Sequence, residues 1–501
     1  MKFTKKLFDM NVAIFSTEIL WTLEYASDLE IMQQHIYDGD NVTHLFCNAS
    51  LPACDANPYM TYDGCQRCIA KRELSYEAVN GNFVKKLFLT LTEEDKRRIA
   101  AIPVRFDSVK ELQSLMLDNF ELGYAAASSV ISVFRNPQPD LKHEMIEGFL
   151  KGAAAVYFSV INYLKKNPTD RFYVFNGRMA HARAALRACE KMGVDYYTHE
   201  RGNSVHHFIT IKNGYVHMVS LLQDIMKQQW ENADPHQRVA IGESFYVNRR
   251  QGKVESRFEF TSGQKAILPE KFDKSKRNIV IYNSSEDEFA SLGTDWKNHV
   301  YETQLSGLVK IKADACEWTD THFYLRIHPN LKNVSKVQQH QLEELSGGNF
   351  TVIPAKSEVS TYELLFAADV IFSFGSSMGI EAVFWGIPSI VAGKFLYRGL
   401  GGTYEPDSHQ EVLSLLRAKL DPLPKEAALI LGYYFMTCGK PYKYFKSENN
   451  REGAFNGVSI EDKLGIPQKL ISKLVNAKMP FSMMEHLRSW NRRRRIHRFE
   501  K

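Results

Sequence analysis

Two polar stretches in the second half of the chain carry residues that could bind an anion. His328, which precedes a proline, follows the apolar run Phe323–Ile327, and Ser376 and Ser377 follow the apolar run 370–374. Proline lacks an N–H and disfavours helix in the residue before it, so the first run is predicted to be a strand ending at His328. Ring N–H, hydroxyl and backbone N–H groups at strand ends can hold a phosphate. The spacing predicts a phosphate site in which His328 is also a candidate catalytic residue.

A helix is expected to begin directly after the two serines and to run from about 378 to 385, with Glu381 one turn inside it. A further polar loop, 283–288, follows the apolar run 278–282. The carboxyl ends of parallel strands share one edge of a sheet, and ligands bind there. The candidate donor-binding residues are therefore Ser284, Ser285, Ser376, Ser377 and Glu381. Glu381 has two interpretations, either a ligand of ribose hydroxyls or a group that satisfies the first turns of its helix.

Charged side chains also follow two predicted strands in the first half of the chain. A tight turn, 176–178, follows the apolar run 172–175, and Glu200 follows the run 194–198. The neighbouring loops would surround this carboxylate with Arg178, His181, Arg183, His199 and Arg201. A buried carboxylate beside cations can accept a proton from a hydroxyl group. Glu200 is therefore a candidate catalytic base, and Asn176, Arg178 and Arg201 are candidate acceptor or anion ligands.

Two other acids compete with Glu200 for the role of base. Glu18 follows the first predicted strand, 11–16, and Asp287 lies in the polar loop after 278–282. The choice of Glu200 rests on its position at a strand end alone, so Glu18 stays the main alternative.

Four of the seven cysteines lie close together in the sequence, with the spacing C-x6-C-x10-C-x2-C. They are Cys47, Cys54, Cys65 and Cys68. One CxxC pair within such a group is compatible with a structural zinc site. Two disulfides, or reduced packing cysteines, are the alternatives, and a cytoplasmic location disfavours disulfides.

Charge is concentrated at the end of the chain. The 501 residues carry a net charge of +5, and the tail 488–501 holds seven Lys or Arg against one acid, so that the remaining chain is about neutral. A neutral body argues against a general nucleic-acid binder. The basic tail, with aromatic and aliphatic residues interleaved, is compatible with an anionic inner-membrane surface, or else with a solvated terminus. No apolar stretch approaches the length that a membrane-spanning helix needs, so a cytoplasmic protein is expected.

Strands alternate with helices along most of the chain, which predicts an α/β protein with two Rossmann-like domains facing across a cleft. The expected divisions are 1–265 for an acceptor-side domain with extra helices and the cysteine loop 47–68, 266–277 for a linker, 278–435 for a nucleotide-sugar domain, and 436–501 for C-terminal helices and the basic tail. No P-loop, G-x-G-x-x-G or Asp-x-Asp metal motif occurs. Protein groups are thus expected to neutralise the phosphate, and no cofactor is required.

The motifs IHPN and FGSSMGIEAVFWGIPSI resemble the C-terminal half of bacterial capsular polysaccharide biosynthesis glycosyltransferases, which have the GT-B fold. LFCNASLPAC, CQRC, FNGRMAHARAAL and THERG are similar to the same broad group. His-Pro and Ser-Ser motifs are shared with GT-B sialyltransferases, Kdo transferases and teichoic-acid glycerophosphotransferases, which use cytidine nucleotides. The resemblance implies that His328, Ser376 and Ser377 contact the donor phosphate. The Asp-Asp-Gly base motif of some sialyltransferases is absent.

These observations predict a glycosyltransferase that moves a sugar from a nucleotide donor, CMP- or CDP-activated by this resemblance, to a saccharide or lipid-linked saccharide of the bacterial surface. Two alternatives stay open: a non-hydrolysing nucleotide-sugar epimerase, which would keep the fold and change the chemistry, and a non-catalytic carbohydrate-binding protein of capsule assembly.

Overall fold

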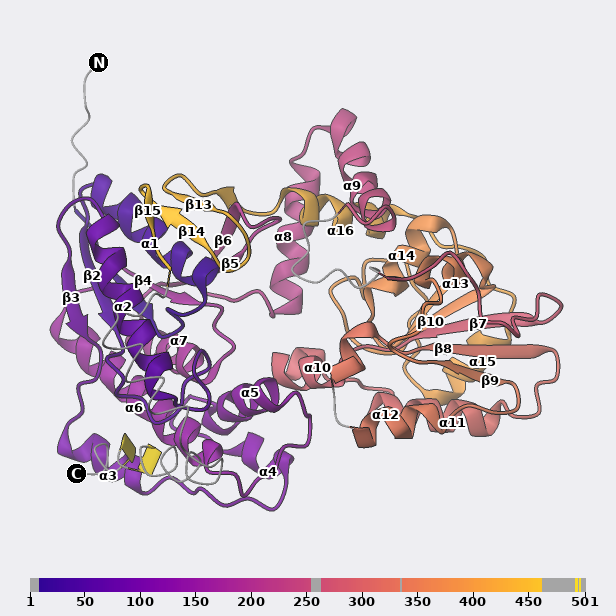
Figure 1. The fold of residues 1–501 in the computed structure, drawn as a ribbon, viewed down its shortest axis with the longest axis horizontal. Helices are drawn as coiled ribbons and strands as arrows, with labels where there is room; N and C mark the ends of the chain where they lie inside the picture. Colours follow the sequence, from indigo (N-terminus) through magenta and orange to yellow (C-terminus); the bar gives the residue numbers. More distant parts are fainter. Residues whose placement is uncertain (1–8, 254–262, 334–335, 462–491, 494, 497–501) are drawn as a thin grey trace. The chain divides into compact units, whose positions relative to one another are not determined.

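The structure is a computed structural model that describes residues 9–253, 263–333, 336–461, 492–493 and 495–496. It divides into two compact units (Figure 1). The first unit comprises 1–134, 138–216 and 438–501, and the second comprises 135–137 and 217–437.

The described part of the first unit contains a seven-stranded sheet with the order β12-β6-β5-β4-β1-β2-β3. Its strands are β1 Asn11–Ser16, β2 Asn41–Phe46, β3 Val84–Leu87, β4 Arg171–Phe175, β5 Tyr196–Arg201, β6 His207–Lys212 and β12 Lys440–Pro441. The five strands from β3 to β5 are parallel, whereas β6 and β12 run antiparallel to their neighbours. The strand order reverses between β1 and β4, and a ligand site is expected at such a switch point.

Helices cover this sheet and supply much of its core. They are α1 Thr22–Tyr37, α2 Tyr62–Ala78, α3 Glu93–Ala100, α4 Val109–Ser114, α5 Leu122–Phe134, α6 Met145–Lys166 and α7 Ala180–Met192. The long apolar face of α6 packs on α7, and both helices are buried over most of their length. The predicted end of α7 at Gly193 is observed, with φ of 66°. A left-handed residue at this position satisfies the last helical carbonyls at low cost when it is glycine.

The C-terminal part of the first unit differs from the predicted helices. Residues 445–459 form a small antiparallel sheet of β13 Phe445–Ser447, β14 Gly453–Phe455 and β15 Val458–Ser459. The buried carboxylate of Glu30 on α1 accepts the backbone N–H groups of Lys443, Tyr444 and Phe445. This side chain therefore fixes the returning chain to α1. The predicted helix beyond 461 lies outside the described residues.

The second unit has a five-stranded parallel sheet with the order β11-β10-β7-β8-β9. Its strands are β7 Arg277–Tyr282, β8 Thr321–Arg326, β9 Phe350–Ile353, β10 Val370–Ser373 and β11 Ser389–Val391. Both faces of the sheet bury aliphatic and aromatic side chains. The order again reverses between two parallel strands, here β7 and β10. The chain thus contains two Rossmann-like α/β units, which confirms the predicted fold class.

The helices of the second unit are α8 Val219–Glu231, α9 Pro235–Arg250, α10 Glu286–Leu292, α11 Gln304–Asp314, α12 Lys336–Glu343, α13 Thr361–Ala367, α14 Ser377–Trp385, α15 His409–Arg417 and α16 Glu426–Thr437, with 3-10 turns at Thr294–Trp296 and Pro329–Asn333. The observed units do not follow the predicted domain limits. Residues 217–253 belong to the second unit, because α8 and α9 pack against α16 (Figure 1). The segment 266–277, expected as a linker, is also part of this unit, where Phe272 stacks on Tyr324.

Candidate active site

Two neighbouring strand-end loops are joined in the second unit. The loop after β7 contains Asn283, Ser284 and Ser285, and His328 lies two residues beyond the neighbouring strand β8. The side-chain oxygen of Asn283 accepts the backbone N–H of His328 at 2.8 Å. Asn330 donates its amide to the Ser285 hydroxyl at 3.3 Å, which joins the same two loops again. The predicted residues His328, Ser284 and Ser285 are therefore brought together at the edge where parallel sheets bind ligands.

The His328 ring is a neutral hydrogen-bond donor. Burial, followed by the charges of Arg326, Arg135 and Arg249, lowers its pKa to about 4. The Nδ1 atom accepts the backbone N–H of Asn330 at 3.1 Å, which leaves the ring proton on Nε2. A neutral ring that is influenced by three arginine charges is suited to donating to an anion whose charge the arginines neutralise.

Two buried polar atoms at the ends of the neighbouring strands β7 and β8 have no hydrogen-bond partner among the described residues, namely Ser284 Oγ and Arg326 Nε. Arg326 is 2% exposed, and its other nitrogens donate to the carbonyl oxygens of Pro354 and Ser357. Buried polar groups are almost always satisfied, so such atoms mark a place where a polar ligand or water belongs.

The two predicted serines lie where β10 turns into α14, but they have different roles. Ser376 is the N-cap of α14, and its Oγ accepts the N–H of Met378 at 3.3 Å. Ser377 is the first helical residue and is half-buried, with its hydroxyl 3.4 Å from the guanidinium of Arg249. Gly375, with φ of 112°, makes the turn before them. Ser376 therefore shapes the helix terminus, and Ser377 with the backbone N–H groups is the part that an anion can reach.

Glu381 is fully buried in α14, and both of its oxygens are engaged. Oε1 accepts from Arg249 of α9 at 3.0 Å, and Oε2 accepts from the Tyr362 hydroxyl at 2.6 Å. Of the two interpretations of this residue, the geometry favours the structural one. Glu381 holds Arg249, and Arg249 contacts Ser377, so Glu381 positions a cation of the site.

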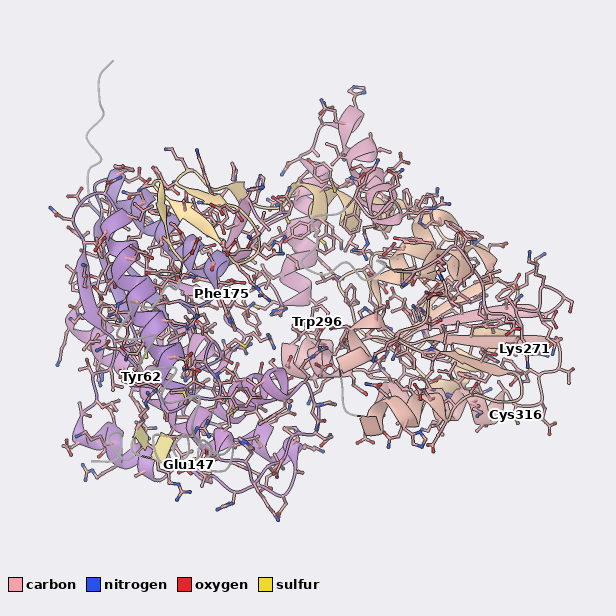
Figure 2. The ribbon with its side chains drawn as sticks, viewed as in Figure 1. Tyr62, Glu147, Phe175, Lys271, Trp296 and Cys316 are labelled. Atoms are coloured by element: carbon pink, nitrogen blue, oxygen red, sulfur yellow. The ribbon has the colours of Figure 1, made fainter. Side chains whose placement is uncertain are left out.

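A second strand-end site lies in the first unit at the switch point between β1 and β4. Asn176 follows β4, whose last residue is Phe175 (Figure 2), and takes the left-handed conformation with φ of 56°. Its amide donates to Glu200 Oε2 at 2.5 Å, and its carbonyl oxygen accepts the N–H of Arg178 at 3.1 Å. The backbone N–H of Arg201 donates to Glu200 Oε1 at 3.0 Å. The predicted residues Asn176, Arg178, Glu200 and Arg201 are therefore neighbours.

Glu200 differs from its predicted position in one detail. It lies inside β5, paired with Ile209 of β6, rather than in a loop after the strand. Its side chain is half-buried. Burial first, and then the charge of Glu24, raises its pKa above the ordinary glutamate value. An oriented, partly exposed carboxylate with a raised pKa has the properties of a general base.

A more deeply buried acidic pair lies near the end of β1. Glu18 is 4% exposed and Asp55 is 7% exposed. Burial, together with the charge of Asp55, raises the pKa of Glu18 to about 8, and burial raises the pKa of Asp55 to about 6. His181 Nδ1 is 3.8 Å from Asp55 Oδ2. Neither oxygen of Asp55 and neither ring nitrogen of His181 has a hydrogen-bond partner within 3.5 Å in the described chain.

Asp55 was not predicted as a site residue. It directly follows Cys54 in an irregular loop, and no strand pattern precedes it that would place it at the sheet edge. The third candidate base, Asp287, lies in the second unit, where its Oδ2 is 3.4 Å from Arg135 Nε.

Replacing Glu18 with glutamine is expected to stabilise the protein increasingly as pH rises from about 5 to about 8. A folded-state pKa above the unfolded value means that folding takes up a proton in this range, so the contribution of Glu18 to stability is lost as pH rises through the folded pKa. Glutamine does not titrate. Differential scanning fluorimetry should show that the melting temperature of Glu18→Gln exceeds that of the wild type by a margin that grows to roughly 5 °C near pH 8. The control is Glu94→Gln, which changes an exposed carboxylate of α3. A difference in melting temperature between Glu18→Gln and wild type that stays constant across this pH range would contradict the burial of an ionisable Glu18.

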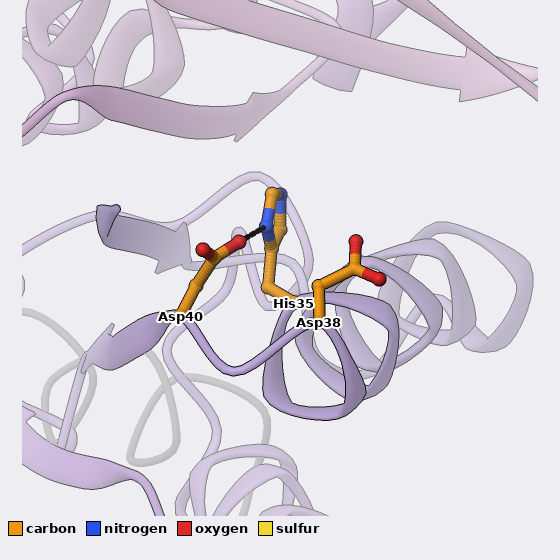
Figure 3. A group of neighbouring side chains, drawn as sticks. All are labelled: His35, Asp38 and Asp40. Atoms are coloured by element: carbon orange, nitrogen blue, oxygen red, sulfur yellow. Dashed lines mark hydrogen bonds and ion pairs between the residues drawn. The ribbon is translucent and has the colours of Figure 1, made fainter. Parts of the chain in front are cut away.

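Figure 3 shows a third cluster, made of His35, Asp38 and Asp40 at the end of α1. His35 Nδ1 is 2.7 Å from Asp40 Oδ2, and its Nε2 is 3.0 Å from the Tyr173 hydroxyl. Asp40 Oδ1 also accepts the N–H of Met10 at 3.0 Å. Both ring nitrogens of His35 are used, so this cluster ties α1 to β2 and β4 rather than forming a metal site.

The basic tail lies mostly outside the described residues. Three of its arginines are described: Arg492 and Arg495 are buried in the first unit, and Arg493 is exposed. Arg492 donates to the carbonyl oxygens of Pro52 and Pro58 and contacts Glu144, and Arg495 donates to the carbonyl oxygen of Leu51. These two side chains are therefore not available to a membrane surface, which corrects the prediction for this part of the tail. No helix in the described ranges is long and apolar enough to span a bilayer.

No protein-family model and no curated protein matches this chain. Among solved structures, the chain is distantly similar to the β-Kdo 2,4 transferase KpsC of Thermosulfurimonas dismutans. The two are 16% identical with a TM-score of 0.36, and the similarity covers 54% of this chain and 81% of that chain. The chain is also similar to the UDP-GlcNAc 2-epimerase of Methanocaldococcus jannaschii, solved with UDP-GlcNAc and UDP. Here the identity is 11% and the TM-score 0.26, and the similarity covers 85% of this chain and 98% of that chain. The glycosyltransferase SnogD of Streptomyces nogalater is 13% identical with a TM-score of 0.24, covering 86% and 95%. Similarity this distant does not assign an activity.

Proposed function

We propose that this chain is a glycosyltransferase that moves a sugar from a nucleotide-activated donor to a hydroxyl group of a bacterial surface saccharide. The observation that carries the proposal is the set of polar side chains at the strand ends of the second unit. A neutral His328, the guanidinium of Arg326 and the hydroxyl of Ser284, which has no hydrogen-bond partner among the described residues, belong to the ends of the neighbouring strands β7 and β8. A nucleotide diphosphate or monophosphate matches this set of donors in charge and hydrogen-bonding capacity.

In this proposal the second unit binds the donor. His328 Nε2 donates to a phosphate oxygen, and Arg326 and Arg135 neutralise its charge. Ser377 and the first backbone N–H groups of α14 bind the same anion at the helix terminus. These groups would stabilise the negative charge that develops on the leaving phosphate, and we propose that they do so without a metal ion.

The first unit supplies the base. The acceptor oxygen forms a bond to the anomeric carbon of the sugar while the bond from that carbon to the phosphate oxygen breaks. The hydroxyl proton moves to Glu200, and the nucleotide leaves with the bonding electrons. Asn176 and the N–H of Arg201 hold the Glu200 carboxylate in a fixed orientation, and we propose that Arg178 binds the acceptor. Glu18 has a pKa of about 8 and is therefore largely protonated near pH 7, which makes it a poorer base.

The capsule or surface-polysaccharide context and the cytidine nucleotide come from the sequence resemblance. We propose CMP- or CDP-activated sugars as the first donors to assay.

Analysis of the products tests this function. The full chain is incubated with nucleotide-sugar donors, with and without a saccharide acceptor, and in the presence of EDTA. We expect release of nucleotide and a lengthened saccharide only when the acceptor is present. An isomerised sugar formed without acceptor would identify a nucleotide-sugar epimerase instead.

A further inference from the structure

Four cysteines in the first unit line a single small cavity. Cys47 directly follows β2, Cys54 lies in the loop after it, and Cys65 and Cys68 lie in the first turns of α2, which begins at Tyr62 (Figure 2). The rest of the lining is mainly apolar and includes Leu20, Leu51 and Met60. Cysteines separated by up to 21 positions in the sequence thus line the same cavity.

Donors surround these sulfur atoms. The amide of Asn57 lies 3.4 Å from Cys65 Sγ, and both terminal nitrogens of Arg495 lie 3.8 Å from it. A Cβ atom at Gly64 would lie 2.7 Å from the Asn57 amide, so glycine is needed for this close approach. Donors to cysteine sulfur are a feature of metal-thiolate sites, where they tune the bound centre.

Positive charge near the cavity would balance bound thiolates. Lys71 and Arg72 on α2 are buried, and Arg72 donates to the carbonyl oxygen of Cys47 at 3.0 Å. A bound metal deprotonates its thiol ligands, so these cations would stabilise the resulting thiolates.

The spacing of the thiols distinguishes between metal centres. Zinc with Zn–S bonds of about 2.3 Å holds its four sulfur atoms about 3.8 Å apart. Among the described residues, His35, Asp38 and Asp40 form a group of three possible metal ligands whose ligand atoms all lie within 4.8 Å of one another. No three of these four cysteines, which all lie in the described ranges, form such a group. An iron–sulfur cluster is also bound by four cysteines, and it holds their sulfur atoms farther apart because several irons separate them.

We propose that Cys47, Cys54, Cys65 and Cys68 bind an iron–sulfur cluster that fixes the loop 47–61 and the start of α2. This loop also carries Asp55, so the centre would support the acceptor-side unit from outside the reacting groups. The inference does not depend on the transferase activity.

Purification of the full chain without oxygen tests this proposal. We expect iron and acid-labile sulfide in equal amounts, with visible absorption that is bleached by dithionite. Cys68→Ser and Cys54→Ser should lose most of the iron. The matched control is Cys438→Ser, a buried cysteine of the same unit that does not line the cavity, and Cys316→Ser is an exposed control (Figure 2). Both controls should keep wild-type iron.

Three results would overturn the proposal. They are one equivalent of zinc without sulfide, two disulfides without metal, and reduced thiols without metal, each measured on wild-type protein by metal analysis and by alkylation with mass spectrometry. Because these measurements use the unaltered chain, they decide the question even if the serine variants fail to fold.

Discussion

Replacing Glu200 with glutamine is expected to lower the turnover number by roughly 10²–10⁴-fold, the usual contribution of a general base. Glutamine keeps the shape of the side chain and can still contact Asn176, but it cannot accept the acceptor proton. Donor affinity should stay unchanged, because the donor ligands belong to the second unit. Steady-state kinetics and calorimetric titration of the nucleotide separate the two quantities.

The pH profile of kcat provides a second readout for Glu200. Burial raises the pKa of this carboxyl group, so wild-type activity should increase as pH rises through that pKa and deprotonates the base. The residual activity of Glu200→Gln should lack this rise. The matched variant is Glu18→Gln, which is expected to keep most of the activity. If Glu18→Gln is inactive and Glu200→Gln is not, the base belongs to the buried pair of Glu18 and Asp55.

Replacing His328 with alanine is expected to weaken nucleotide binding by roughly tenfold to a hundredfold, because a hydrogen bond to a charged group is worth about 1.5–3 kcal/mol. The ring is neutral across the physiological range, so the loss should not depend on pH between about 6 and 8. His322→Ala is the matched control. That histidine is on the same strand, β8, and its Nε2 is 2.8 Å from the Thr351 hydroxyl, which lies on the neighbouring strand β9.

If His328→Ala and His322→Ala bind nucleotide equally well, His328 is a structural residue of the strand end. Equal melting temperatures for the two variants would show that any difference in affinity is local.

The strand-end residues were predictable because apolar runs in this chain stop at prolines, glycines or polar triplets. His328, Ser377 and the 283–285 loop lie close to where the pattern placed them. The fold class followed from the same alternation of strands and helices. The sequence pattern does not predict β3. Its residues Val84–Leu87 are exposed and two of the four are lysines, whereas a buried strand is expected to be apolar.

The partnerships between distant residues were not predictable. Glu381 and Arg249 are 132 residues apart, and no periodicity links them. Glu30 anchors the chain at 443–445 from more than 400 residues away. Arg492 and Arg495 were read as part of an exposed basic tail, yet backbone carbonyl oxygens of the cysteine loop satisfy them in the interior. Such contacts depend on tertiary packing, and local sequence does not encode which partner is chosen.

The central claim is that the second unit holds the nucleotide of an activated sugar. Calorimetric titration of the full chain with CMP, CDP, UDP and GDP tests it most directly. We expect at least one nucleotide to bind with one site per chain and to bind markedly more weakly to His328→Ala than to His322→Ala. Binding of a surface saccharide without measurable affinity for any of the four nucleotides would contradict the claim and would favour a non-catalytic carbohydrate-binding protein.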